Sequence, residues 1–113
     1  MARPRIVDDP AYRDLRADDL KHFQEHIAGR QKVDFSNADL RGVDLRNVDV
    51  SKLILRDAYL RDADLRGLDL RKLDMEGCSL HGAQISGTYF PANVSAQEIA
   101  NSVEYGTRIR AGV

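Results

Sequence analysis

The chain has 113 residues, of which 42% are hydrophobic, and its 17 basic and 18 acidic side chains nearly balance. This length fits one domain with a modest core, and the balance excludes binding to nucleic acid or to an anionic membrane by net charge alone. No apolar run approaches the ~20 residues of a membrane span, and the first residues lack the apolar segment of a secretory signal. We therefore expect a cytoplasmic protein with no membrane partner and no direct nucleic-acid binding.

The first 32 residues divide into an irregular arm and a short helix. Pro4 and Pro10 interrupt the charged residues of 1–16, so we expect no regular structure there. From Asp18 to Ala28 a helix is predicted, because an aspartate can cap its first amides and Gly29 can end it. Its apolar residues fall at positions i, i+3 and i+7 and form one stripe: Leu20, Phe23 and Ile27.

The same helix carries a pattern typical of one class of zinc hydrolase. His22, Glu25 and His26 match H-x-x-E-H, in which two histidines share a helix face and the glutamate serves as a base. A catalytic zinc also needs a third protein ligand beside an open pocket, and the carboxylates Glu98 and Glu104 lie far along the chain. We therefore predict a solvated helix face with no metal, and zinc hydrolysis is a remote alternative.

Residues 33–92 repeat every five residues, twelve times. Every repeat centre is apolar: Phe35, Leu40, Leu45, Val50, Leu55, Leu60, Leu65, Leu70, Met75, Leu80, Ile85 and Phe90. The position two residues before the centre is apolar in every repeat except the last: Val33, Ala38, Val43, Val48, Leu53, Ala58, Ala63, Leu68, Leu73, Cys78, Ala83 and Thr88. This regularity makes the repeat the organising feature of the chain.

A five-residue period fits neither regular element. On an α-helix each step of five residues turns through ~500°, so the centres would leave any one face. On a straight strand the centres would alternate between two faces. The chain must instead turn within each repeat, so that both apolar side chains point inward again and successive turns of chain stack as a solenoid. Gly, Asn and Asp recur two positions after the centres, where such corners are needed.

The stretches A-D-L-R-G at 38–42 and at 63–67 resemble the pentapeptide-repeat family, whose consensus is A-(D/N)-L-x-x. The resemblance covers residues 33–92 and implies an all-β solenoid, a right-handed quadrilateral β-helix with four pentapeptides in each of about three coils. We expect the short α-helix within residues 1–32 and a C-terminal α-helix within residues 93–113 to cap its open ends. Several inward positions are larger than the family's usual alanine and predict a less regular cross-section: Val33, Val43, Val48, Leu53, Leu68 and Leu73.

The outward positions of the repeats carry charges of both signs. Aspartates precede many centres and arginines follow them, and residues twenty apart would stack if four repeats make one coil. Two arginine ladders result, Arg41 with Arg61 and Arg46 with Arg66. They form either a solvated surface of weak ion pairs or a docking surface for an acidic partner.

Two residues interrupt the aspartate column. Ile54 and Tyr59 each stand one residue before a centre, where the pattern expects Asp or Asn. They are either two single apolar residues on the surface or the start of an apolar site for a partner protein.

After Pro91 the repeat ends and a second helix is predicted. Ser95 and Glu98 form a capping box, so the helix should run to about Tyr105, where Gly106 supplies its stop. Its predicted apolar stripe is Ala96, Ile99, Ala100 and Val103. This stripe either caps the chain's own solenoid or, as the resemblance allows, joins two copies as a homodimer through the C-terminal end. Contacts of either kind would involve Ile99, Val103, Tyr89 and Phe90.

Nothing in the sequence indicates catalysis or a cofactor. There is no glycine-rich phosphate loop and no nucleophile–base pair, and a filled solenoid offers no cleft. We therefore predict a non-enzymatic protein–protein interaction module, or adaptor, of a bacterial cytoplasm. The resemblance also implies an alternative, because some family members mimic DNA and bind type II topoisomerases such as gyrase. The eight basic and ten acidic residues of 33–92 supply little negative charge for such a mimic.

Overall fold

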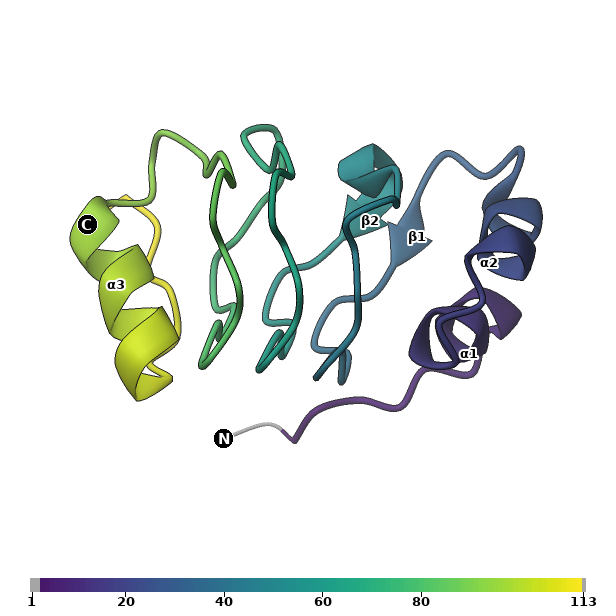
Figure 1. Cartoon of the computed structure of the whole chain (residues 1–113), viewed down its shortest axis with the longest axis horizontal. Helices are drawn as coiled ribbons and strands as arrows, with labels where there is room; N and C mark the ends of the chain where they lie inside the picture. Colours follow the sequence, from purple (N-terminus) through teal and green to yellow (C-terminus); the bar gives the residue numbers. More distant parts are fainter. Residues whose placement is uncertain (1–2, 113) are drawn as a thin grey trace.

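A computed structural model describes residues 3–112 (Figure 1). Its helices and strands, in chain order, are α1 (Pro10–Arg16), α2 (Leu20–Ile27), β1 (Val33–Asp34), the 3-10 helix η1 (Val50–Lys52), β2 (Leu53–Ile54) and α3 (Ala96–Tyr105). Helices α1 and α2 lie at one end of the molecule and α3 at the other, with the repeat stretch between them as backbone loops lying side by side (Figure 1). Within the described residues, no helix has the length and apolar character needed to cross a membrane.

Residues twenty apart in the sequence are neighbours in the repeat stretch. Strands β1 and β2 pair in parallel, with Val33 opposite Leu53. Isolated parallel bridges continue the same spacing: Asp39–Tyr59, Asp44–Asp64, Tyr59–Ser79, Asp64–Gln84 and Asp69–Tyr89. These bridges have the twenty-residue spacing expected of a solenoid with four repeats in each coil, but residues 3–112 hold no strand longer than two residues. A corner in every five residues leaves too few extended residues for longer strands.

The inward positions of the repeats form the core. Of the twenty-four side chains, all are buried except Leu73, Ile85, Thr88 and Phe90, which are half-buried and follow residue 72. Cys78 lies among the buried positions, and its thiol donates to the Leu55 carbonyl at 2.9 Å. Burial raises the pKa of the Cys78 thiol to about 12. The repeat pattern thus predicted most of the core, which also includes residues outside the repeat such as Phe23 and Ile109.

Several corners between repeats place the chain at positive φ. Asp57 and Asp62 have φ of 62° and 59°, and the glycines twenty residues later, Gly77 and Gly82, have φ of 77° and 71°. A Cβ added to Gly77 would collide with the Asp57 carboxylate, and one added to Gly82 would collide with that of Asp62. At these two corners glycine suits the positive φ, and any larger residue would also require the aspartate carboxylate to move.

Helix α1 occupies residues that were predicted to be irregular, so that prediction was wrong. Pro10 is the first residue of the helix, where a fixed φ and a missing N–H favour helix formation. The Asp9 carboxylate caps the helix by accepting a hydrogen bond from the Ala11 amide at 2.9 Å. The predicted helix of residues 18–28 is confirmed as α2, with Asp19 as its N-cap and Phe23 buried on its inner face.

Helix α3 confirms the predicted boundaries and half of the predicted apolar stripe, because Ile99 and Val103 are half-buried and pack against the core. The Ser95 hydroxyl accepts a hydrogen bond from the Glu98 amide at 3.1 Å, and Gly106 ends the helix with φ of 77°. Ala96 and Ala100 are exposed, whereas Glu98 and Ser102 are buried. Polar contacts determine which face of α3 is buried. The Ser102 hydroxyl accepts a hydrogen bond from the Leu80 amide at 2.8 Å. The Glu98 carboxylate accepts one from the Arg110 guanidinium at 3.0 Å.

Candidate functional site

Most outward arginines are clamped by an aspartate two residues earlier. In the first clamp, Arg41 donates from Nε and Nη2 to the two carboxylate oxygens of Asp39 at 2.8 and 2.7 Å. The same pairing recurs at Asp44–Arg46, Asp64–Arg66 and Asp69–Arg71. Residues i and i+2 of an extended segment point to the same side, which brings these groups together. The arginine hydrogen bonds lower the pKa of Asp44 and of Asp69 to about 2.

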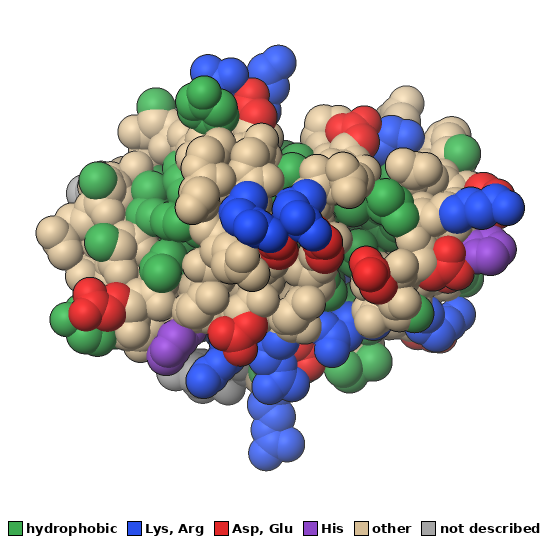
Figure 2. All heavy atoms as spheres, viewed as in Figure 1, with side chains coloured by type: hydrophobic (Ala, Val, Ile, Leu, Met, Phe, Trp, Pro, Cys, Tyr) green, Lys and Arg blue, Asp and Glu red, His purple; other side chains and the backbone are tan. Residues whose placement is uncertain are grey.

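The predicted Arg46–Arg66 ladder is internally neutralised. Besides its own clamp to Asp44, Arg46 approaches the Asp64 carboxylate at 3.1 Å, and Arg66 clamps the same Asp64 at 2.7 Å. Two arginines and two aspartates therefore form one network. Figure 2 shows such side-by-side placement of basic and acidic side chains over the repeat stretch. This ladder offers little unpaired charge to an acidic partner.

An arginine has no such clamp where the aspartate is missing. Arg56 follows Ile54 by two residues and pairs instead with Asp74 at 2.8 Å. Arg61 follows Tyr59 by two residues, and its ion pair is to Asp62 at 3.8 Å. Each of the other five outward arginines has a carboxylate oxygen within 2.8 Å. Arg61 is therefore the least neutralised arginine of the column.

Ile54 and Tyr59 do not share one open apolar surface. Ile54 is 37% exposed, whereas Tyr59 is half-buried. The guanidinium of Arg108, in the C-terminal tail, lies 4.7 Å from the centre of the Tyr59 ring and donates to its hydroxyl. The tail therefore covers part of the surface that was predicted to bind a partner, and a role for Ile54 and Tyr59 in binding stays a prediction.

Arg61 borders a groove of about 370 Å³, which we call the Arg61 groove. Its described lining consists of Pro4, Arg41, Tyr59, Arg61, Ser79, His81, Tyr105 and Gly106. Arg41, Arg61 and His81 stand twenty residues apart, as predicted for one ladder. The described lining includes no aspartate or glutamate, whereas four other hollows among the described residues each include at least one aspartate. The carboxylates nearest to its arginines are Asp39, which clamps Arg41, and Asp62, which lies 3.8 Å from Arg61.

One wall of the groove is fixed by the end of α3. A Cβ on Gly106 would lie 2.7 Å from Nδ1 of His81, so the imidazole packs directly against the glycine backbone. The Ser79 hydroxyl donates to the Gly106 carbonyl at 3.2 Å. Tyr105, the last residue of α3, is 67% exposed at the rim. Sequence reasoning missed Ser79 and Tyr105, because no local pattern places the end of α3 beside the repeat surface.

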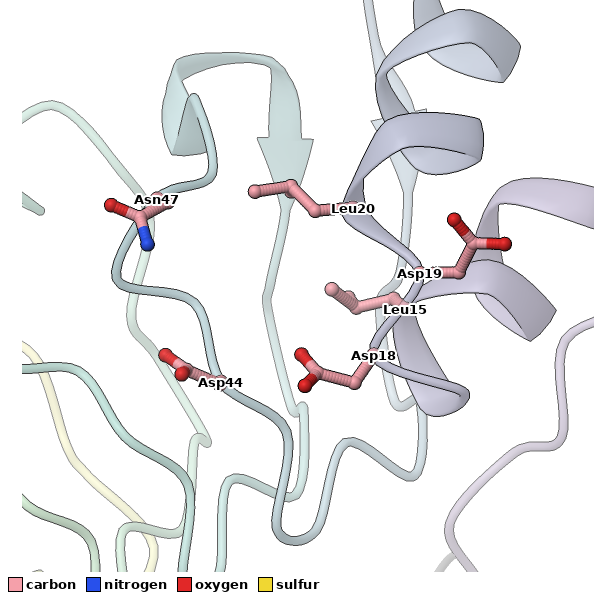
Figure 3. Close-up of a pocket in the computed structure, with 6 residues that line it drawn as sticks. All are labelled: Leu15, Asp18, Asp19, Leu20, Asp44 and Asn47. Carbon is pink, nitrogen blue, oxygen red and sulfur yellow. The ribbon is translucent and has the colours of Figure 1, made fainter.

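The hollow drawn in Figure 3 lies between the helices α1 and α2 and the repeat stretch. Leu15, Asp18 and Leu20 point from the helices toward the repeat stretch, and Asp19 points away from it (Figure 3). The hollow has a volume of only about 40 Å³, which suits water better than a ligand. In residues 3–112, no group of three or more His, Cys, Asp or Glu side chains is placed to hold a metal ion.

The two histidines of the H-x-x-E-H pattern each contact a carboxylate. His22 Nδ1 lies 2.6 Å from Asp19, and His26 contacts Asp14 at the end of α1. Both rings lie on the exposed side of α2. The hydrogen bond that the His22 ring donates to the Asp19 carboxylate raises the pKa of His22. These pairs account for the histidines without a metal.

The residues predicted for a dimer or cap contact lie near the C-terminal end with different exposures. Tyr89 is 59% exposed, and the Arg71 guanidinium lies 5.1 Å from the centre of its ring. Phe90, Ile99 and Val103 are half-buried and pack against the core. Their role in joining two copies stays a prediction.

Comparison with known proteins gives one match. A family model described as pentapeptide repeats matches residues 31–57 and 54–90, with eight copies of the repeat. No curated protein matches the chain, and no solved structure matches it.

Proposed function

Because the chain belongs to the pentapeptide-repeat family, we propose that it is a non-enzymatic protein–protein interaction module. Pentapeptide repeats imply a β-helix solenoid, whose interior is filled by its own side chains. In this chain the inward leucines and their neighbours fill that space. Function then depends on outward side chains held at fixed positions, so that little conformational freedom is lost on binding.

We further propose that the repeat stretch forms a right-handed quadrilateral β-helix of about three coils, 33–52, 53–72 and 73–92. The twenty-residue spacing of the bridges supports four pentapeptides in each coil. Helices α1 and α2 would cap the first coil, with the Tyr12 hydroxyl donating to the Asp39 carbonyl at 2.6 Å. Helix α3 and the tail would cap the last coil, since the Gly82 amide donates to the Val103 carbonyl at 2.9 Å.

The Arg61 groove is the surface that best suits a partner, and an acidic segment is the partner that best suits the groove. The observation that carries this proposal is the weak pairing of Arg61 in a lining without described carboxylates. An incoming carboxylate would meet a guanidinium that has no competing clamp, and charge-assisted hydrogen bonds to arginine are among the stronger polar contacts. The clamped arginines Arg46 and Arg66 would have to break existing pairs to do the same.

The observations do not favour a DNA-mimicking binder of type II topoisomerases. A DNA mimic needs a negative surface, and the outward aspartates Asp39, Asp44, Asp64 and Asp69 are each paired with an arginine. Their charge is neutralised locally, so these faces do not present the run of negative charge of a phosphate backbone.

Affinity capture from host lysate tests the proposal with two matched variants. Arg61→Gln removes the weakly paired guanidinium, whereas Arg66→Gln removes a clamped guanidinium from the neighbouring outward column. We expect a specific partner to be retained by the wild type and by Arg66→Gln and to be lost with Arg61→Gln.

Two results would contradict the proposal. A partner lost with Arg66→Gln but kept by Arg61→Gln would move the binding surface to the Arg46–Arg66 ladder. If the wild-type chain captured no partner but self-associated in sedimentation experiments, the protein would be a subunit of a homo-oligomer and not an interaction module. Amide-resolved NMR spectra of both variants should match the wild type away from the substitution, which excludes unfolding as the cause of a loss.

A further inference from the structure

The Arg61 groove offers several hydrogen-bond donors at neighbouring levels of the repeat. Arg41, Arg61 and His81 stand at successive twenty-residue steps, and consecutive levels are ~4.8 Å apart at strand spacing. Arg41 uses Nε and Nη2 on Asp39, so its Nη1 is the nitrogen without a contact in that clamp. Among residues 3–112, the ion pair of Arg61 is the 3.8 Å contact to Asp62, so its donor fork can turn to a ligand. The groove therefore suits an anion with oxygens at more than one level.

A phosphoryl group fits this arrangement better than a carboxylate does. A phosphate monoester carries about two negative charges at neutral pH and three terminal oxygens, which guanidinium forks bind in bidentate geometry. A carboxylate has one charge and two oxygens in a plane, so it offers less charge and fewer acceptor oxygens to the donors at neighbouring levels. Arg61 could take two phosphoryl oxygens while Arg41 or His81 takes the third.

The rim of the groove suits a polypeptide carrier of that group. Tyr105 exposes 67% of its surface at the end of α3, and Pro4 lies in the lining from the N-terminal arm. Their apolar surfaces can contact residues that flank a modified side chain. The groove is open to solvent and about 370 Å³ in volume, which is enough to admit a phosphorylated side chain.

We infer that the Arg61 groove binds the phosphoryl group of a phosphorylated side chain on the partner protein. This inference rests on the proposed function and specifies its ligand. Arg61 supplies the principal fork, Arg41 and His81 supply the adjoining donors, and Tyr105 contacts the flanking chain. Recognition of phosphorylated segments by arginine clusters is an established physical mode.

Titration of the ¹⁵N-labelled full chain with phenyl phosphate, and separately with benzoate, tests the inference. We expect phenyl phosphate to shift the amides of Arg61, His81 and Gly106 and to bind about tenfold or more tightly than benzoate, since its second charge adds charge-assisted contacts. Arg61→Gln should weaken phenyl phosphate binding about tenfold, and Arg66→Gln should change it less than about twofold. The spectra themselves report whether each variant is folded.

Equal affinity for the two anions would overturn the phosphoryl inference and leave a plain carboxylate site. Shifts spread over all the outward arginines, or binding that is unchanged in Arg61→Gln, would overturn the site itself. Phosphatase treatment of the lysate separates the inference from the proposed function. A partner that is lost with Arg61→Gln but survives phosphatase supports the interaction module and contradicts the phosphoryl ligand, whereas loss in both supports both.

Discussion

The two ends of the repeat stretch are closed by different kinds of contact. At the N-terminal end α1 and α2 bury large apolar side chains, and the Phe23 and Phe35 rings lie 6.5 Å apart with both residues fully buried. At the C-terminal end the buried positions of α3 are Glu98 and Ser102, and both make hydrogen bonds. The buried residues of α1 and α2 are therefore aliphatic or aromatic and those of α3 are polar, while the C-terminal end also buries Val94 and Ile109 outside α3.

The C-terminal end of the repeat stretch also differs in its backbone hydrogen bonds. The amides of Leu65 and Leu70 donate to carbonyls nineteen residues farther along, those of Gln84 and Tyr89, at 2.9 and 2.8 Å. The equivalent amides at Ile85 and Phe90 have no hydrogen-bond partner among residues 3–112. The hydrogen bonds at the C-terminal end therefore pair only some of the backbone amides of the last repeats. The half-buried core residues Ile85 and Phe90 are among those that they leave unpaired in residues 3–112.

The largest expected effect comes from the centre, which both ends protect. Leu60 is fully buried, and Leu60→Asp would place an unpaired carboxylate in the core at a cost above about 5 kcal/mol, comparable to the stability of a whole domain. We expect loss of the folded signal in circular dichroism and NMR. Ile54→Asp, at an exposed position, is the control and should fold. A folded Leu60→Asp would show that the centre is not the common core.

Truncating one aromatic side chain tests the apolar closure. Phe23→Ala should lower the free energy of unfolding by about 3–5 kcal/mol, because the side chain is fully buried and leaves a cavity. Ile99→Ala on α3 should cost about 1–2 kcal/mol, because that side chain is only half-buried. Urea unfolding followed by circular dichroism measures both. Equal losses would contradict the contrast between the ends.

Removing one hydroxyl tests the polar closure. Ser102→Ala deletes the acceptor of the buried Leu80 amide and should cost about 1–3 kcal/mol. Ser86→Ala, at an exposed position, should change stability by less than about 0.5 kcal/mol. Hydrogen exchange would localise the effect, since the Leu80 amide should lose protection. Unchanged exchange at Leu80 would mean that this bond does not hold α3 in place.

The smallest effect should come from lowering the pH, which protonates the aspartates that clamp the outward arginines. The pKa of Asp44 and of Asp69 is about 2 in the folded chain, below the ordinary value of 3.8. As the pH falls, these aspartates take up protons in the unfolded chain at a higher pH than in the folded chain. Their contribution to the free energy of unfolding is therefore complete above about pH 4 and is lost as the pH falls toward 2. Urea unfolding at several pH values should show this slope, and Asp44→Asn should reduce it. An unaltered slope in Asp44→Asn would assign it to other carboxylates.

The period of the repeat predicted the core, and the capping box predicted α3, because both depend on local chemistry. Helix α1 was missed because its prolines were interpreted as breakers, although Asp9 before Pro10 is a typical helix start. The weak ion pairing of Arg61 could have been predicted from the sequence, because Tyr59 stands where a clamping aspartate would be. That signal was interpreted as an apolar site instead.

Contacts between distant segments left no such signal. The stacking of Arg108 on Tyr59 joins residues 49 positions apart, and no periodicity relates the tail to the repeats. The burial of Glu98 and Ser102 instead of Ala96 and Ala100 has the same origin. Hydropathy ranks alanine above glutamate for burial, but the partners Arg110 and Leu80 are known only once the chain is folded.

The packing of each corner aspartate against the glycine twenty residues later affects how such a chain can lengthen during evolution. A Cβ at position 77 would collide with Oδ1 of Asp57, and one at position 82 would collide with Oδ1 of Asp62, so each carboxylate would have to turn away. A gene duplication that copied residues 53–72 in tandem would place a second aspartate at both of these positions and would require both rearrangements. A copy of residues 73–92, which carries glycine at both corners, would meet no such obstacle. Growth of the chain is therefore easier by repeating its last twenty-residue unit than its middle one.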